Sequence, residues 1–312
     1  MQSGRHATHL TPPLPATIKF LRLCNAQVQY AYSTYILIQS TQKKLFSTTV
    51  FIFFRIFVGK IRLPSIMKRY ILFLLLCCFQ LVALPYKLVI DAGHGGRDPG
   101  AQNRAGKEKN INLAVALAFG KLVERNCPDV KVIYTRKTDV FVPLDERANI
   151  ANRAKADLFI SIHTNSTAKR IGPQGTETYT LGMHRASDNL DVAKRENSVI
   201  TLENGFEQKY EGFDPNSSES YIIFELMQDH NMESSVKLAG LIQKQFRTTA
   251  KRIDKGVHQA GFLVLRATSM PSVLVELGYL NNPNDAAFLT TTSGVNALAK
   301  SIYNAFVAYY KK

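Results

Sequence analysis

Three polar side chains stand at the ends of apolar runs that are typical of buried strands. His94 lies in IDAGHGG, His163 in ISIHTN and Glu276 in LVELGY. Sites in open α/β sheets form at the carboxyl ends of strands, so we expect these groups to converge on one crevice. A fourth group, Glu108, stands at the expected start of a helix.

These residue types suit a catalytic metal ion. Zn²⁺ in catalytic sites usually takes three nitrogen or oxygen ligands from the protein and keeps one position for water. His94, Glu108 and His163 would supply such a set. Because zinc lowers the pKa of its water to about 7, hydroxide becomes available at neutral pH. Glu276 would then be the separate carboxylate that accepts and passes on protons.

Each residue also has a purely structural interpretation. A histidine at a strand end is more often structural than a ligand, a glutamate that opens a helix serves the helix dipole, and a strand-end glutamate can simply pair with an arginine. The turn at 93–96, GHGG, lacks both the GxGxxG spacing and the lysine of a P-loop, which argues against phosphate binding. The residues alone therefore favour a metal hydrolase without excluding structural roles.

The apolar pattern predicts the fold that must hold these groups. Apolar runs predict strands over 86–91, 130–134, 158–162, 176–181, 262–265 and 273–277. Helical spacing predicts helices over 111–122, 144–155, 236–246 and 298–309. Several strands are apolar throughout, which is typical of a sheet covered on both faces, so we predict an α/β domain.

The front of the chain differs from the rest in charge and hydropathy. Of the net charge of +15, +10 lies before residue 84, which removes most of the support for nucleic-acid binding. The segment 67–83, MKRYILFLLLCCFQLVA, has the pattern of a secretory signal peptide. Signal peptides begin at the N-terminus, so residues 1–66 are interpreted as a gene-model extension, with a membrane-associated leader as the alternative.

Signal cleavage leaves residues 84–312 as the exported protein. A lipoprotein anchor at Cys77 is the less favoured alternative, because Leu76 is bulky where such sites carry a small residue. Three of the four cysteines fall in the leader, so Cys127 remains alone and no internal disulfide is expected. No stable membrane anchor is expected after cleavage.

Five ordered motifs resemble the zinc-dependent N-acetylmuramoyl-L-alanine amidases of the cell-separation and autolysin type (amidase 3). They are VIDAGHGGRDPGA, KE at 107–108, RANIANRAKADLFISIHTNS, GTETYTL and PSVLVELGYLNNPND. The resemblance covers residues 86–182 and 233–310. It implies a mixed, mostly parallel sheet flanked by helices, similar to zinc exopeptidases. It also implies cleavage of the amide between N-acetylmuramic acid and L-alanine of the stem peptide.

The resemblance assigns roles residue by residue. His94, Glu108 and His163 become the ligands of one Zn²⁺ per chain, and Glu276 becomes the general base and acid that works with zinc-bound hydroxide. Arg147 and Asn165 fall on motif positions that orient the site or the substrate. Peptidoglycan is then the substrate, with roles in wall turnover and daughter-cell separation. Export to a Gram-negative periplasm is the expected localisation.

The acidic segment 183–232, with a net charge of −6, is an insert that the resemblance does not cover. In related division amidases a helix here can cover the zinc until a protein activator moves it. A helix that starts at Ser217 or Ser218, both good N-caps, would let Glu219 or Glu225 reach the metal. The other interpretation, a loop or small subdomain on the substrate side, also stays open.

Two rival functions remain. A zinc peptidase acting on stem peptides or proteins would release amino acids, and a degenerate wall-binding module would lack the ligands.

Overall fold

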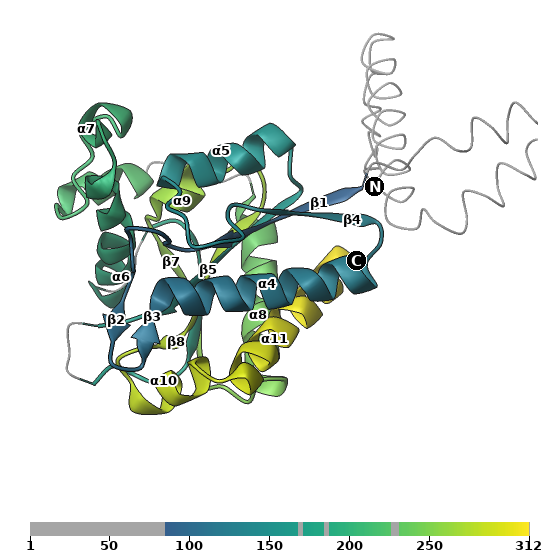
Figure 1. The fold of residues 1–312 in the computed structure, drawn as a ribbon. Helices are drawn as coiled ribbons and strands as arrows, with labels where there is room; N and C mark the ends of the chain where they lie inside the picture. The colour runs from purple at the N-terminus through teal and green to yellow at the C-terminus, as the bar shows by residue number, and fades with distance from the viewer. Residues whose placement is uncertain (1–84, 168–170, 184–186, 226–230, 312) are drawn as a thin grey trace, which may run out of the picture. The chain divides into compact units, whose positions relative to one another are not determined.

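A six-stranded sheet forms the centre of the computed structural model, which describes residues 85–311 apart from 168–170, 184–186 and 226–230 (Figure 1). The side chains of 223–225 are also outside the described set. The described residues belong to one unit, Leu84–Lys312. The predictions for 1–66 and for the signal peptide at 67–83 lie outside the described residues.

The sheet has the strand order β4-β1-β5-β8-β6-β7. Its strands are β1 (Tyr86–Ala92), β4 (Val130–Tyr134), β5 (Leu158–Asn165), β6 (Thr176–Leu181), β7 (Asp254–Ala260) and β8 (Ser272–Tyr279). All neighbours are parallel except β6 and β8, which pair antiparallel. A small hairpin of β2 (Gln102–Asn103) and β3 (Gly106–Lys107) precedes the first helix. The predicted mixed, mostly parallel α/β sheet is confirmed.

Helices cover both faces of the sheet, which explains why its central strands are apolar throughout. One face packs against α4 (Glu108–Asn126), α8 (Met232–Thr248) and α11 (Thr292–Tyr310). The other packs against α5 (Leu144–Ala154), α6 (Ser187–Asn197) and α9 (Leu263–Arg266). In β1, Leu88 and Ile90 point to the first layer while Val89 points to the second. Each face of the strand therefore needs its own apolar residues.

The remaining short elements lie in the insert and near the C-terminus. They are η1 (Ser198–Leu202), α7 (Phe206–Lys209), η2 (Glu219–Glu225) and α10 (Pro283–Leu289). The insert is anchored by buried apolar side chains, among them Val192, Ile200 and Tyr221, in the second core layer. Among the helices of the described part, none is long and apolar enough to span a bilayer.

One prediction of secondary structure is wrong, and one strand of the main sheet was missed. The run 262–265 forms the short helix α9 instead of a strand, because a four-residue apolar run does not distinguish the two. The strand β7, DKGVHQA, went unpredicted. It lies at the edge of the sheet and is half-buried over most of its length, so it carries no apolar run.

Candidate metal centre

The parallel strands bring the predicted site residues to one edge of the sheet. His94 follows the end of β1, His163 lies near the end of β5, and Glu276 lies on β8 directly beside His163 in the strand register. Glu108 is the first residue of α4. The structure therefore brings together all four of these residues, which are far apart in the sequence.

Four buried side chains form a cluster that could hold a metal ion: His94, Glu108, His163 and Glu196. One ligand atom from each lies within 4.8 Å of all the others. His94 Nε2 is 3.1 Å from Glu108 Oε1 and 3.1 Å from Glu196 Oε2. His163 Nδ1 is 3.3 Å from Glu108 Oε1 and 2.9 Å from Glu196 Oε2. Each imidazole nitrogen thus faces the same two carboxylates.

Hydrogen bonds fix the orientation of these side chains. Glu108 Oε2 accepts from the backbone N–H of Ala101 at 2.8 Å, and Oε1 accepts from Asn112 Nδ2 and from the backbone N–H of Thr164. His94 Nδ1 lies 2.6 Å from Asp98 Oδ2, so Nε2 is the nitrogen turned to the cluster. A carboxylate behind a ligating histidine is the usual arrangement that fixes its tautomer and ring orientation.

The glycine before His94 allows the close approach of the two imidazoles. A Cβ at Gly93 would lie 2.4 Å from His163 Nε2, which leaves no room for a side chain. His94 itself has a φ of 60°, in the left-handed region that few residues adopt. The motif AGHGG therefore provides the close approach and the unusual backbone conformation that the site requires.

Arg147 is 2% exposed and forms hydrogen bonds at the end of β1 and just beyond it. Its guanidinium donates to Asp91 Oδ1 at 2.7 Å, to the carbonyl of Ala92 at 2.8 Å and to the carbonyl of His94 at 2.9 Å. Burial alone would raise the pKa of Asp91, but Arg147 and the hydroxyl of Ser161 outweigh it and lower that pKa. Of the two predicted roles, orienting the site fits these contacts.

Substitution of Arg147 should destabilise the protein. Arg147→Gln leaves the buried Asp91 carboxylate without its cation, so we expect the free energy of unfolding to fall by about 3–5 kcal/mol in urea denaturation. Arg153→Gln is the matched control on the same helix, because Arg153 pairs with Glu146 at the surface and should change stability little. Equal effects of the two substitutions would contradict the supporting role of Arg147.

Glu276 is fully buried and points into the same region from β8. Neither of its carboxylate oxygens has a hydrogen-bond partner, and Arg195 forms an ion pair with it, with Nη2 3.7 Å from Oε1. Burial and then the charge of Glu196 raise the pKa of Glu276 well above its usual value. Its environment in this conformation therefore favours the neutral form of the carboxyl group.

Asn165 connects the metal cluster to the insert. Its Nδ2 donates to Glu177 Oε2 at 3.0 Å, and its Oδ1 accepts from Arg195 Nη2 at 3.0 Å. Arg195 also donates to the carbonyl of Ser166 and to Glu196 Oε1. Asn165 therefore lies beside the site, in contact with the residue that precedes Glu196.

Sequence reasoning missed Glu196. It lies in the insert, as foreseen for an acidic ligand, but on α6 and not on a helix after Ser217. Glu219 is exposed and accepts from Ser217 Oγ, while the side chain of Glu225 is outside the described residues. The insert holds ten acidic residues, so charge alone could not select one, although Asp188 in the first turn of α6 is a residue type typical of helix starts.

The carboxylates and imidazoles of the cluster shift one another's pKa values. Burial raises the pKa of a carboxyl group, yet the two imidazoles outweigh burial and lower the pKa of Glu108. The imidazoles together with Arg195 lower the pKa of Glu196 in the same way. Burial lowers the pKa of a histidine, yet the facing carboxylates raise that of His163 to about 9 and that of His94 well above its usual value. Each carboxylate therefore stays ionised, and each imidazole stays protonated, because the groups that face it carry the opposite charge.

The residues fit a divalent metal ion. His94 Nε2, His163 Nδ1 and Glu196 Oε2 are buried and without hydrogen-bond partners, and all three face the same point. Imidazole and carboxylate are the donors that zinc takes in catalytic sites. Buried polar atoms are normally paired, so a bound cation accounts for these three atoms.

An α/β sheet with a cluster that could hold a metal ion and a further buried carboxylate at one edge is typical of a metal-dependent hydrolase. Comparison with known families narrows this class: residues 88–308 match the family N-acetylmuramoyl-L-alanine amidase, and the chain belongs to this family. It is a hydrolytic amidase of peptidoglycan.

Individual relatives agree with this assignment. The chain is 30% identical to N-acetylmuramoyl-L-alanine amidase AmiA of Escherichia coli over 226 residues, which cover 72% of this chain and 75% of that protein. The catalytic domain of the amidase CwlV from Bacillus (Paenibacillus) polymyxa is 30% identical, with a TM-score of 0.52 over 72% of this chain and 98% of that one. Amidase AmiC2 of Nostoc punctiforme is 27% identical, with a TM-score of 0.54 over 73% and 98%.

Proposed function

We propose that the cluster holds one Zn²⁺ through His94, Glu108 and His163, and that the enzyme cuts the amide between N-acetylmuramic acid and L-alanine. The observation that carries this proposal is that two imidazole nitrogens without hydrogen-bond partners, from His94 and His163, meet Glu108 beside the buried carboxylate of Glu276. When bound, zinc supplies a Lewis acid that polarises a carbonyl and lowers the pKa of a water molecule.

Glu276 moves the proton in this proposal. Its carboxylate takes the proton of the attacking water and returns it to the amide nitrogen, so the peptide leaves as a neutral amine. In the structure its pKa is raised by burial and by Glu196. Departure of Glu196 would remove the neighbouring negative charge, and a bound cation would oppose the effect of burial. Both changes lower the pKa of Glu276 and so favour its ionised form, which can act as the base.

The direct test uses the purified protein and isolated peptidoglycan. We expect release of intact stem peptides with a free L-alanine amine, identified by mass spectrometry, and loss of release with a metal chelator. Addition of Zn²⁺ should then restore the release of stem peptides. Release of amino acids or shortened peptides would instead support the rival zinc peptidase. No release by the metal-loaded wild type and by metal-loaded Glu196→Ala alike would support the wall-binding alternative.

Glu276→Gln separates proton transfer from metal binding. We expect zinc content, measured by metal analysis, and thermal stability to remain, while turnover of a muramyl peptide falls by about 10²–10⁴. His163→Gln is the comparison variant, because it should lose both the metal and the activity. Near-normal turnover by Glu276→Gln would refute the assigned role.

The insert is inferred to inhibit the enzyme in this conformation. Glu196 places a carboxylate oxygen between the two imidazoles, where a water molecule or a substrate carbonyl would need to bind. Arg195, the preceding residue, lies against Glu276 and donates to Asn165. Helix α6 thus engages the metal ligands, the general base and a predicted orienting residue together, and an activator protein would act by moving it.

Glu196→Ala should raise activity. Three ligands remain and the blocked position opens, so we expect turnover without any partner to increase roughly ten-fold, the size of a typical coupling free energy. Glu219→Ala is the matched control, because Glu219 is an exposed acid of the same insert and should leave turnover unchanged. Loss of zinc and of activity in Glu196→Ala would instead make Glu196 a permanent ligand.

Localisation and physiological role follow from the substrate. We propose an exported enzyme of the periplasm that acts in wall turnover and daughter-cell separation, supported by the signal-peptide pattern at 67–83 and the amidase family. N-terminal sequencing of the exported protein tests the cleavage after Ala83.

A further inference from the structure

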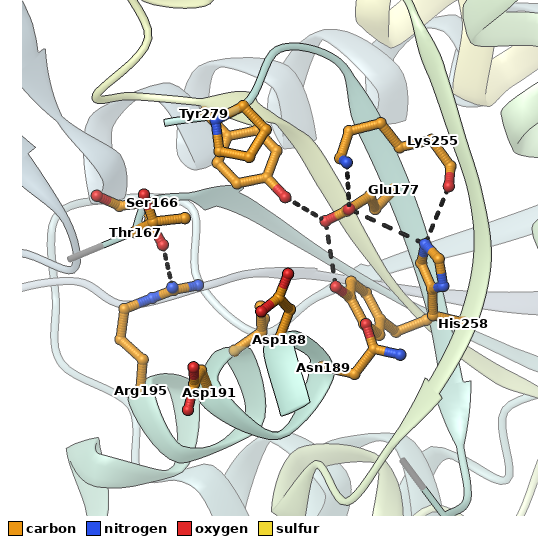
Figure 2. Close-up of a pocket in the computed structure, with 13 residues that line it drawn as sticks. Ser166, Thr167, Glu177, Asp188, Asn189, Asp191, Arg195, Lys255, His258 and Tyr279 are labelled. Atoms are coloured by element: carbon orange, nitrogen blue, oxygen red, sulfur yellow. Dashed lines mark hydrogen bonds and ion pairs between the residues drawn. The ribbon is translucent and has the colours of Figure 1, made fainter. Parts of the chain in front are cut away.

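A second cavity lies next to the metal cluster and takes no part in the chemistry described above. It has a volume of about 800 Å³ and lies between α6 and the strands β6 and β7 (Figure 2). Ser166 and Arg195 line both this cavity and the smaller one at the cluster. Its size is that of a ligand pocket, and the shared residues make the two cavities neighbours.

The sheet wall of this pocket carries a fixed pair of basic side chains. Lys255 Nζ lies 3.5 Å and His258 Nε2 lies 3.9 Å from Glu177 Oε1. The other oxygen of Glu177 accepts from Asn165, from Tyr179 and from Tyr279 (Figure 2). Glu177 therefore holds both basic groups in place from a buried position, while their side chains remain about 30% exposed to the pocket.

A β-bulge brings Lys255 to this position. Thr176 pairs with Asp254 and Thr178 with Val257, so β7 has one more residue than β6 in this interval. Gly256, with a φ of +104°, lies within the bulge. Bulges redirect side chains and are common beside active sites, and here the extra residue lies opposite Glu177.

The helix wall carries two acidic side chains next to Arg195. Asp188 and Asp191 are exposed on α6 and line the pocket across from Lys255 and His258 (Figure 2). A ligand with one carboxylate and one ammonium group would match the two walls. Peptides that contain an acidic and a diamino residue have this character.

The pocket lies within reach of the cut bond. The strands β8, β6 and β7 are neighbours in the sheet, so Glu276 and the basic pair are separated by two strand spacings, roughly 10 Å. About three residues of extended peptide cover that distance. A peptide attached at the cluster would therefore place its second and third residues in the pocket.

We propose that this pocket binds the stem peptide of the substrate, with Lys255 and His258 on a peptide carboxylate and Asp188 and Asp191 on the ammonium group of a diamino acid. This inference rests on the proposed function, because the peptide enters from the amide that is cut at Glu276. It predicts that the enzyme distinguishes stem peptides by charge.

Calorimetry with the product-side peptide tests the pocket without turnover. The zinc-loaded full chain is titrated with L-Ala-γ-D-Glu-L-Lys-amide, with its α-carboxyl amidated form and with its side-chain acetylated form. We expect each modification to weaken binding roughly ten-fold, as for the loss of one charged hydrogen bond. Equal affinity of the wild type for all three peptides, or no measurable binding, overturns the proposal.

Variants assign each preference to one wall. Lys255→Gln should lose the preference for the free carboxylate and keep that for the free amine, and the double variant Asp188→Asn with Asp191→Asn should do the reverse. Lys244→Gln, at an exposed position of α8, should behave as the wild type. Unchanged discrimination in both pocket variants would also overturn the proposal.

The outcomes separate this inference from the proposed function. Charge-selective binding of the free peptide without cleavage of muramyl peptides would support the pocket and contradict the amidase site. Cleavage of muramyl peptides with equal rates for the native and the amidated stem, together with equal binding, would support the site and contradict the pocket.

Discussion

The burial of two carboxylates against two imidazoles is the interaction on which the site depends. Glu108 and Glu196 are almost fully shielded from solvent, and a buried charge is costly unless it is paired. In the absence of another cation, protons on His94 and His163 supply the compensation, which is why the pKa of each histidine is raised. A divalent ion at the same point would neutralise both carboxylates and leave the imidazoles neutral, the form in which they bind metals.

The rest of the fold supports this cluster with two kinds of elements. His94 follows β1, Glu108 begins α4 and His163 lies on β5. These three elements pack in the first core layer, where β1 and β5 pair in a fixed register. Glu196 comes from the insert, whose helix lies against the site through polar contacts and a smaller apolar patch. Helices held by fewer buried contacts open at lower free energy than the core. Glu196 is therefore the carboxylate of the pair that we expect to leave when the enzyme is activated.

The sequence allowed prediction of what lies on the central strands. Continuous apolar runs identify β1, β5 and β8, and the polar residues at their ends identify His94, His163 and Glu276, because parallel strands end at one edge of the sheet. The edge strand β7 and the helix α9 were not predictable from periodicity, since one is half-buried and polar and the other too short. Glu196 depends on the packing of the insert, a long-range contact that leaves no local pattern.

Helix α6 couples the two cavities beside the sheet. Near its C-terminal end, Glu196 faces the metal cluster and Arg195 lines both cavities, while Asp188 and Asp191 line the proposed peptide pocket nearer its N-terminus. At 1.5 Å per residue these two ends are roughly 10 Å apart, so a tilt about the N-terminal end would withdraw Glu196 and keep the helix wall of the pocket. Linkage is reciprocal: if the peptide binds more tightly once Glu196 has left, the bound peptide favours that departure by the same free energy. Substrate and activator would then act on one helix in the same direction.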